Sequence, residues 1–494
     1  MKRFTSIVLI VCGLVFQGLW AEPPQPPSFK DIPSLPDGKQ GERILSIIET
    51  FNSGSPDRLR RFLNEDCDER FRGFASTDGH IDAFMGMFQE TGGIDFSGIR
   101  VYTPERQGET VVILKDRNYG NWRAFVLRFT DAPGYLIQGF SFNLARPPAG
   151  TVESPRTEEQ VLQETQQSVT TLIKKGVFSG TLLIAKGEKI LLTMVGGEAS
   201  KSFHVLNDID TKFNLGSMNK MFTATAIVRL IEQGKLSLDD TIDKYIDETW
   251  LPAEITKKIT IRHLLSHSSG LGSYFNDVYD KSSRHLFRKL DDYKTLIKDD
   301  KPAFEPGSRF QYSNTGMFLL GVIIEKVTGE DYFDHIRRVI YAPAGMNNTD
   351  CYEMDYPVEN LAIGYSPDWK SPYKWQNNLY KHVIKGGPAG GGFSTVKDLH
   401  RFALALLAGK YVSKASLDMM WTDHLAAFYG FGFSVAKTRA GKTVGHGGGF
   451  SGINAKLDIY LDSGYIVSVM SNVDMGADPL ANKISSFLAR LKKM

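Results

Sequence analysis

The chain has 494 residues, enough for two or three domains and a substantial buried core. It is 42% hydrophobic and 23% charged with a formal net charge of +2, which is the composition of an ordinary globular protein. A near-neutral chain without a basic run has no electrostatic footprint for nucleic acid, so we expect no nucleic-acid partner.

The N-terminal segment, residues 1–21, has the layout of a secretory signal peptide. It opens with two basic residues, continues with an apolar run from Ile7 to about Leu19, and reaches the small residue Ala21 before a proline-rich stretch. An uncleaved membrane anchor is the alternative, because the apolar run approaches the minimum length of a span. No stop-transfer pattern follows, so we expect cleavage, a periplasmic or secreted protein, and no stable membrane span afterwards.

A small α+β domain is predicted next. Residues 22–40 are rich in proline and predict an extended linker. Within residues 41–145, an amphipathic helix over "ERILSIIETFNSG" is followed by a short helix that Ser55 caps, and three or four strands follow between about Ile99 and Leu144. The arrangement is similar to the cone-shaped nuclear-transport-factor-like domains that precede some exported hydrolases. A docking or spacer domain is the plainer interpretation.

A larger α+β domain is predicted for residues 158–494, after a linker over residues 146–157. It opens with the helix "EEQVLQETQQSVTTLIKKG" and two strands, and passes through a mostly helical middle from about Phe213 to Lys381. Four strands and the helix "NKISSFLARLKK" close it. We therefore expect an antiparallel sheet flanked by its terminal helices, with a helical insert. Cys67 and Cys351 are far apart and indicate neither a disulfide framework nor a metal site.

The first candidate for chemistry lies in "FNLGSMNKMFTATAIVRLIEQGKL". Ser217 stands at a turn into an apolar helix, with Lys220 one turn later on the same face. A serine hydroxyl needs a base to take its proton, and lysine can be that base if burial and a helix N-terminus lower its pKa. The Ser217 backbone N–H can also face a developing oxyanion. An N-cap serine beside a solvated lysine is the alternative, because S-x-x-K recurs by chance.

The second candidate lies in "PGSRFQYSNTGMFLLGVIIEKVTG". Tyr312 and Asn314 stand two residues apart just before another apolar helix, so both side chains can enter one cleft. A tyrosine beside a cationic lysine ionises more readily and can pass protons to a leaving group. Asn314 would hold the lysine side chain or a substrate amide. A packed tyrosine and a turn asparagine are the alternative.

The third candidate is "VGHGGGFSG", where His446 precedes three glycines. The order of S-x-x-K, Y-x-N and a basic residue before a glycine-rich strand edge resembles the penicillin-recognising serine hydrolases. These include class C-type β-lactamases, D-alanyl carboxypeptidases, D-aminopeptidases and related esterases. The phrases "ITIRHLLSHSSGLG", "APAGMNNT" and "GGPAGGGFSTVKDLHRF" are also similar to this family. The resemblance covers about residues 158–494 and implies a β-lactamase/transpeptidase-like fold there.

The resemblance also implies roles in an acyl-enzyme mechanism. Ser217 would be the nucleophile, Lys220 its base partner, and Tyr312 the general base and acid. The backbone N–H groups of Ser217 and Gly449 would form the oxyanion hole. Gly449 suits this role because it has no side chain, so substrate can lie close against the strand. No metal or organic cofactor is required. The expected substrate-binding or oxyanion residues are Asn314, His446, Gly448 and Gly449.

One departure from the family pattern bears on the substrate. Many β-lactamases and carboxypeptidases have Lys-Thr-Gly where this chain has His446, Gly447 and Gly448. Histidine is only partly protonated near neutral pH and Gly447 has no hydroxyl, so recognition of a substrate carboxylate should be weaker here. We therefore expect an exported serine hydrolase acting on a small ester, amide or peptide. A β-lactamase or D-alanyl-D-alanine carboxypeptidase is the alternative within this class, and a non-catalytic receptor or scaffold the alternative outside it.

Other motifs carry less weight. A lipase-type interpretation of "HGGG" needs a G-x-S-x-G elbow, and a phosphate loop needs G-x-x-x-x-G-K-[ST]; the sequence contains neither. His263 and His267 stand four residues apart, as zinc ligands can, but no third ligand is in view. The glycines of "GGPAGGGFST" predict close backbone packing near the site. The oligomeric state is not predicted.

Overall fold

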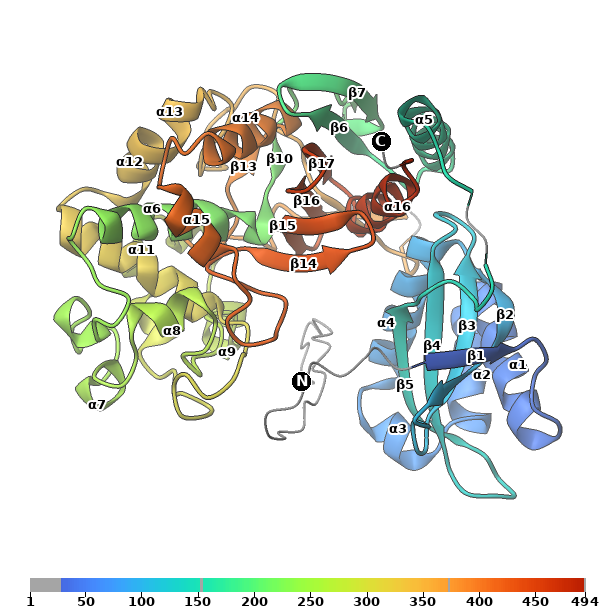
Figure 1. Ribbon diagram of the computed structural model, residues 1–494. Helices are drawn as coiled ribbons and strands as arrows, with labels where there is room; N and C mark the ends of the chain where they lie inside the picture. Colours follow the sequence, from blue (N-terminus) through green and yellow to red (C-terminus); the bar gives the residue numbers. More distant parts are fainter. Residues whose placement is uncertain (1–27, 152–153, 372–373, 493–494) are drawn as a thin grey trace.

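The computed structural model describes residues 28–151, 154–371 and 374–492, and two large antiparallel sheets organise it (Figure 1). The predicted signal peptide lies outside these residues. Within them, no helix is both long and apolar enough to cross a membrane.

The N-terminal unit is a five-stranded antiparallel sheet whose strands follow one another in chain order, with helices packed on one face. The predicted cap is present, because the Ser55 hydroxyl accepts a hydrogen bond from the Arg58 backbone N–H. The helices are α1 (Lys39–Ser53), α2 (Pro56–Glu65), α3 (Glu69–Gly73) and α4 (Thr77–Thr91), and the strands are β1 (Ser28–Ile32), β2 (Ile94–Thr103), β3 (Thr110–Asp116), β4 (Trp122–Phe129) and β5 (Ile137–Leu144).

Alternation along the strands builds the core of this unit. In β3, Val112 and Leu114 face the helices, and Ile113 lies in a smaller cluster on the opposite face. Phe125 of β4 is fully buried, and its ring centroid lies 5.7 Å from that of Phe51 on α1. The expected order of helices followed by an antiparallel meander is therefore confirmed.

The prediction of an extended linker over residues 22–40 is wrong for part of that range. Residues 28–32 form β1, which pairs with β2 at the edge of the sheet. The Arg100 guanidinium donates to Asp31 at 2.8 Å and stacks 3.8 Å from the centroid of the Phe29 ring, which holds the strand in place. The prolines around residues 28–32 concealed this strand in the sequence. Pro33 comes after its last residue and does not interrupt it, and edge strands tolerate proline nearby.

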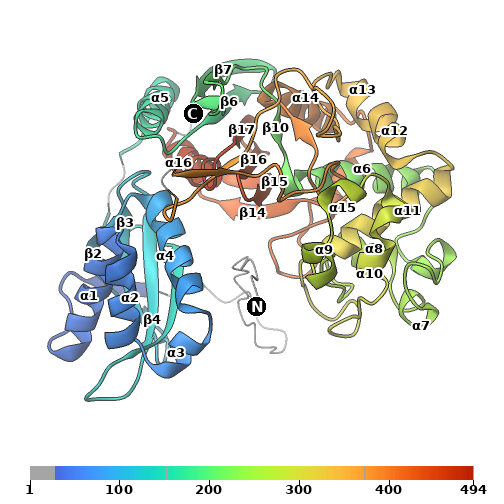
Figure 2. The same cartoon turned by 180° about the vertical axis from the view of Figure 1, so that it is seen from behind.

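The second unit is built on a six-stranded sheet in the order β14-β15-β16-β17-β6-β7, with every pair antiparallel. Its strands are β6 (Gly180–Lys186), β7 (Lys189–Gly196), β14 (Ser434–Thr438), β15 (Gly441–Phe450), β16 (Ile453–Tyr460) and β17 (Tyr465–Ser471). The helices α5 (Glu158–Lys174) and α16 (Asp478–Leu488) pack on the face toward the N-terminal unit, and α14 (Val396–Leu407) packs on the other face, as both views show (Figure 2).

Both faces of this sheet are buried, which explains the unbroken apolar run in β6. Leu183 and Ala185 belong to the core shared with the helical part, whereas Leu182 and Ile184 belong to the core under α5 and α16. A strand covered on both faces has no solvent side on which polar residues would alternate. The expected sheet with flanking terminal helices is confirmed.

The middle of the chain contains two long apolar helices, α6 (Asn219–Glu232) and α11 (Asn314–Thr328), which pack against each other. Between them, turns and charged residues break the chain into shorter pieces, so this region is less helical than expected. The remaining elements are β8 (Glu198–Ser200), β9 (Val205–Leu206), β10 (Phe213–Asn214), η1 (Gly216–Met218), η2 (Ile242–Lys244), α7 (Ala253–Thr256), α8 (Ile261–Leu265), α9 (Asp277–Lys281), η3 (Arg284–Leu286), η4 (Leu290–Tyr293), α10 (Lys294–Ile297), α12 (Tyr332–Ile336), η5 (Arg337–Tyr341), α13 (Ala342–Ala344), β11 (Tyr365–Pro367), β12 (Trp375–Asn377), β13 (Phe393–Ser394) and α15 (Lys414–Met420).

The N-terminal unit docks on the start of α16 through the turn between β3 and β4. Tyr119 is buried in the core beneath α16, and its hydroxyl donates to the Met475 carbonyl at 3.3 Å. The Asn121 amide donates to the Pro479 carbonyl at 3.2 Å. Among the described residues, Cys67 and Cys351 lie in different cores, and both are buried free thiols.

Candidate active site

Ser217 lies where the chain turns from β10 into η1 and α6. The preceding Gly216 has a φ of 50°, a left-handed conformation that glycine adopts without strain. The Asn214 side chain accepts the Gly216 backbone N–H at 2.9 Å and fixes this turn. Ser217 is half-buried, whereas both of its neighbours are buried, so its hydroxyl is the accessible group of the turn.

Lys220 is fully buried one helical turn after Ser217. Its Nζ donates to the Asn314 side-chain oxygen at 2.9 Å and to the Ala389 carbonyl at 2.5 Å. Across the part of the chain that the structure describes, no carboxylate pairs with it, and burial holds its pKa well below the usual 10.5. An uncharged amine has two N–H groups and one lone pair. Both N–H groups are used here, so the lone pair is left to accept a proton.

The phenol of Tyr312 lies against both of these residues. The Lys220 Nζ is 4.8 Å from the centroid of the Tyr312 ring. Burial raises the pKa of the phenol above its usual value, and a hydrogen bond with the Ser217 hydroxyl opposes that rise only in part. The expectation that Tyr312 ionises readily is therefore wrong. Burial disfavours both the phenolate and the ammonium that would promote it, so it favours a neutral phenol beside a neutral amine.

His267 supports the segment that carries Tyr312. Its Nδ1 accepts the Ser313 backbone N–H at 3.1 Å, and its ring centroid lies 4.3 Å from that of Tyr312. Ser313 caps α11, and Asn314 donates to the Ser273 hydroxyl at 3.1 Å while it receives Lys220. In the described ranges no three potential metal ligands cluster.

The glycine-rich strand approaches the Ser217 turn closely. Strand β14 pairs with β15 only as far as Gly445, and the rest of β15 packs against η1 instead. A Cβ on Gly448 would lie 1.8 Å from the Leu215 carbonyl oxygen and 3.0 Å from the Ser217 nitrogen, and one on Gly216 would lie 2.9 Å from the Gly449 nitrogen. Because Gly216 and Gly448 have no side chains, the backbone of the Ser217 turn and the backbone of the strand can lie directly against each other.

His446 is buried beside this strand, and its two hydrogen bonds define its tautomer. Its Nδ1 lies 2.5 Å from the Gly447 carbonyl, which can only accept, so Nδ1 carries the hydrogen. The Nε2 therefore accepts from the Tyr429 hydroxyl, 3.0 Å away. Burial lowers the pKa of His446 to about 3. The expectation of a partly protonated histidine near neutral pH is wrong, because this imidazole is neutral.

The loop over residues 386–392 contributes contacts that the sequence did not reveal. Besides the Ala389 carbonyl that holds Lys220, the Gly392 carbonyl accepts the Leu215 N–H at 2.7 Å. A Cβ on Gly386 would lie 2.2 Å from the Gly391 carbonyl carbon, so the predicted close backbone packing is confirmed. A backbone carbonyl has no signature in the sequence, and Tyr429 in "FYGFGF" resembles an ordinary packing residue.

The region that carries these side chains matches a known family. Residues 158–487 match the family model described as Beta-lactamase. The chain belongs to the beta-lactamase family. A penicillin-binding protein of Bacillus subtilis (strain 168) is 33% identical over 319 residues, which are 61% of this chain and 70% of that protein.

Solved structures agree with this beta-lactamase assignment. A penicillin-binding protein from Bacillus halodurans has a TM-score of 0.60 at 29% identity and covers 64% of this chain and 98% of its own. A D-stereospecific amidohydrolase from Streptomyces sp. has a TM-score of 0.54 at 26% identity, over 65% of this chain and 97% of its own. The expected β-lactamase/transpeptidase-like fold is confirmed, and the protein is a serine hydrolase of the beta-lactamase and penicillin-binding protein type. The likeness of residues 41–145 to nuclear-transport-factor-like domains stays a prediction.

The close contact between Gly448 and the Ser217 turn can be tested with a matched pair of substitutions. Gly448→Ala would drive a methyl group into the Leu215 carbonyl, so we expect ester hydrolysis to fall by about 100-fold and the free energy of unfolding by about 1–3 kcal/mol. Gly449→Ala is the control, because the nearest atoms to its Cβ, on Asn454 and Ile453, are 3.8 and 3.9 Å away. Urea unfolding should be unchanged in the control. Equal stability of Gly448→Ala and the unaltered protein would contradict the packing described.

Proposed function

We propose that the protein is an exported serine hydrolase that cleaves an ester or amide bond in a small molecule or peptide, through an acyl-enzyme on Ser217. One observation carries the proposal. Lys220 is a buried amine, without a carboxylate partner in the described chain, one turn from an accessible serine. A neutral amine in that position is the base that serine needs.

The proposed acylation passes protons from Ser217 to Lys220 through Tyr312 and exchanges one bond at the carbonyl carbon. The Ser217 Oγ attacks the carbonyl carbon, and its proton passes to the Tyr312 oxygen while the Tyr312 proton passes to the lone pair of Lys220. The oxyanion that forms accepts hydrogen bonds from the backbone N–H groups of Ser217 and Gly449. The protonated lysine returns a proton through Tyr312 to the leaving oxygen or nitrogen as the bond to the carbonyl carbon breaks. A water molecule then releases the acyl group by the same route.

Asn314 is proposed to keep Lys220 in place for both steps. Its side-chain oxygen accepts one amine N–H and its amide nitrogen donates to Ser273, so its orientation is fixed from both ends. The Ala389 carbonyl accepts the second N–H. Both acceptors stabilise the ammonium that forms transiently, because each bond strengthens when the nitrogen becomes charged.

The neutrality of His446 supports a substrate without an obligatory carboxylate. At the position where the family resemblance implies a carboxylate-binding lysine, this chain has an uncharged imidazole whose Nε2 is occupied by Tyr429. An uncharged ring supplies no ion pair. A β-lactamase or D-alanyl-D-alanine carboxypeptidase is the second candidate, favoured by the penicillin-binding relatives.

A panel of substrates separates these candidates. We expect p-nitrophenyl esters and amides to be hydrolysed, and we expect no gain in kcat/KM when a matched substrate carries a free carboxylate next to the cleaved bond. Nitrocefin and a D-alanyl-D-alanine peptide should be turned over more slowly than the ester. Steady-state kinetics measures each value. Faster turnover of nitrocefin or the peptide than of every ester would assign the second candidate.

The nucleophile is tested in the same assays. Ser217→Ala should lower ester hydrolysis by about 10⁴-fold or more and abolish the acyl adduct in intact-mass spectra, with folding unchanged. Ser451→Ala, in the turn after the glycine-rich strand, is the matched control and should retain activity. A folded protein that forms no adduct with a fluorophosphonate or with labelled penicillin would instead support a non-catalytic receptor.

Export is proposed from the N-terminal sequence. The basic start, the apolar run and Ala21 before the proline-rich stretch support cleavage after that alanine. N-terminal sequencing of the protein recovered outside the cytoplasm should begin at Glu22. Recovery of a chain that starts at Met1 in the cytoplasmic fraction would contradict this part of the proposal.

A further inference from the structure

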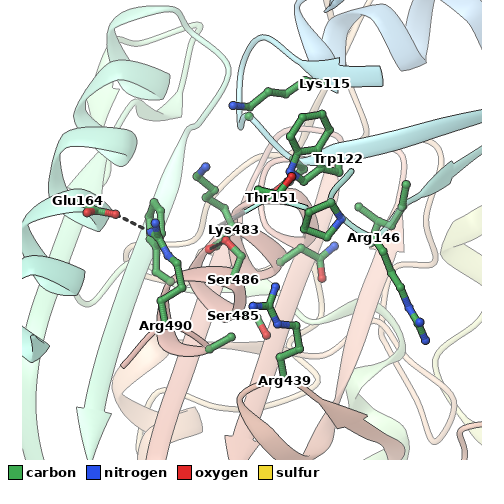
Figure 3. Close-up of a pocket in the computed structure, with 18 residues that line it drawn as sticks. Lys115, Trp122, Arg146, Thr151, Glu164, Arg439, Lys483, Ser485, Ser486 and Arg490 are labelled. Atoms are coloured by element: carbon green, nitrogen blue, oxygen red, sulfur yellow. Dashed lines mark hydrogen bonds and ion pairs between the residues drawn. The ribbon is translucent and has the colours of Figure 1, made fainter. Parts of the chain in front are cut away.

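We propose that a pocket between the N-terminal unit and α16 binds a small polyanion bearing phosphate or several carboxylate groups. The pocket has a volume of about 590 Å³, which lies in the range of small-molecule sites. Strand and turn residues of the N-terminal unit form one wall, and α16 and the residues after it form the other (Figure 3). None of Ser217, Lys220 and Tyr312 lines it, so it is separate from the proposed catalytic site.

Basic residues outnumber acidic ones in the described lining. They come from both units of the protein, and among the lining residues that the structure describes Glu164 is the one acidic residue. Figure 3 shows the Arg146 guanidinium turned away from the other cations, so we do not count it in the site. The basic residues that line the pocket are Lys115, Arg146, Arg439, Lys483 and Arg490.

Lys115 and Lys483 converge on the same point from opposite walls. A Cβ on Gly120 would lie 3.3 Å from the Lys483 Nζ and 3.7 Å from the Lys115 Cε. Neither lysine forms an ion pair with any residue of the three described ranges. The Lys115 Nζ lies 5.3 Å from the centroid of the Trp122 ring, and the Lys483 Nζ lies 4.9 Å from that of the Phe487 ring. Burial lowers the pKa of Lys483, and the charges of Lys115 and Arg490 lower it further. Two like charges held together at a domain junction are destabilising unless an anion joins them.

Two carboxylates whose charges act on Lys483, those of Asp116 and Glu164, are already engaged. Asp116 accepts from the Arg123 guanidinium at 3.2 Å and from the backbone N–H of Gly120 at 2.9 Å. Glu164 accepts from the Arg490 guanidinium at 2.6 Å and from Arg156 at 2.5 Å, and the first of these bonds is drawn in Figure 3. These bonds engage Asp116 and Glu164 with arginines and backbone, and among the described residues neither carboxylate forms an ion pair with Lys115 or Lys483.

The ordinary structural account of these cations is incomplete. Cations near the carboxyl end of a helix are favoured by the helix dipole, which explains Arg490 just after α16. It does not explain Lys115, which lies on β3 in the other unit. The lining also includes a neutral donor, the Asn482 amide, which suits an anion.

Calorimetric titration of the full-length protein at low ionic strength tests the site. The probes are inorganic pyrophosphate for the phosphate class and citrate for the carboxylate class. We expect at least one to bind, and we expect Lys483→Met and Lys115→Met each to weaken binding on the order of tenfold. Methionine keeps the apolar stem of lysine, so the fold is preserved. Lys410→Met, which removes an exposed lysine far along the chain from the pocket, should leave binding unchanged.

Ester hydrolysis by the same variants keeps this proposal separate from the proposed function. Both pocket variants should hydrolyse esters like the unaltered protein, since neither residue lies in the catalytic site. Tighter binding of pyrophosphate than of citrate, or the reverse, supports the site and names its preferred group. The proposal would be overturned if neither probe bound. It would also be overturned if the Lys483→Met and Lys115→Met variants bound the probe as tightly as the Lys410→Met control.

Discussion

The amine of Lys220 is buried completely among groups that can accept its two hydrogens but cannot neutralise a charge. Burying an unpaired ammonium costs several kcal/mol, whereas a neutral amine with both N–H groups bonded is tolerated. The site follows from this constraint. Helix α6 supplies the lysine, the start of α11 supplies Asn314, and the loop over residues 386–392 supplies the carbonyl. All three must meet for the amine to remain buried.

The same neutrality extends over the neighbouring side chains. Burial raises the pKa of Tyr312 and lowers the pKa values of Lys220 and His446, that of His446 to about 3, so it favours the uncharged form of all three groups. A proton can then move along Ser217, Tyr312 and Lys220 without passing a fixed opposite charge that would trap it. Backbone N–H groups supply the stabilisation that charged side chains do not, which is why the strand must lie so close to the turn.

The sequence predicted the parts of the site that side chains carry. Three motifs, far apart along the chain, indicated Ser217, Lys220 and Tyr312, and the structure brings all three together. Most strands and the terminal helices followed from apolar patterning and caps such as Ser55. The proline-rich composition concealed β1, because pairing at a sheet edge depends on a partner strand far along the chain.

Other properties of the site depend on burial and on backbone atoms, which no single residue type reports. The ionisation of Tyr312 and His446 was predicted wrongly, because a sequence gives the group but not its solvent exposure. The carbonyl of Ala389 could not be predicted, since every residue has one. The convergence of Lys115 and Lys483 likewise requires the docked arrangement of the two units.

The protonation state of Lys220 is the central claim, and it can be measured directly. Heteronuclear NMR of protein labelled with ¹³C at lysine Cε, with Lys220→Ala to assign the signal, reports the pKa of this side chain. A resonance of an uncharged amine at neutral pH, with a pKa well below 10.5, is the predicted result. A resonance that titrates near 10.5, like those of exposed lysines, would contradict the account.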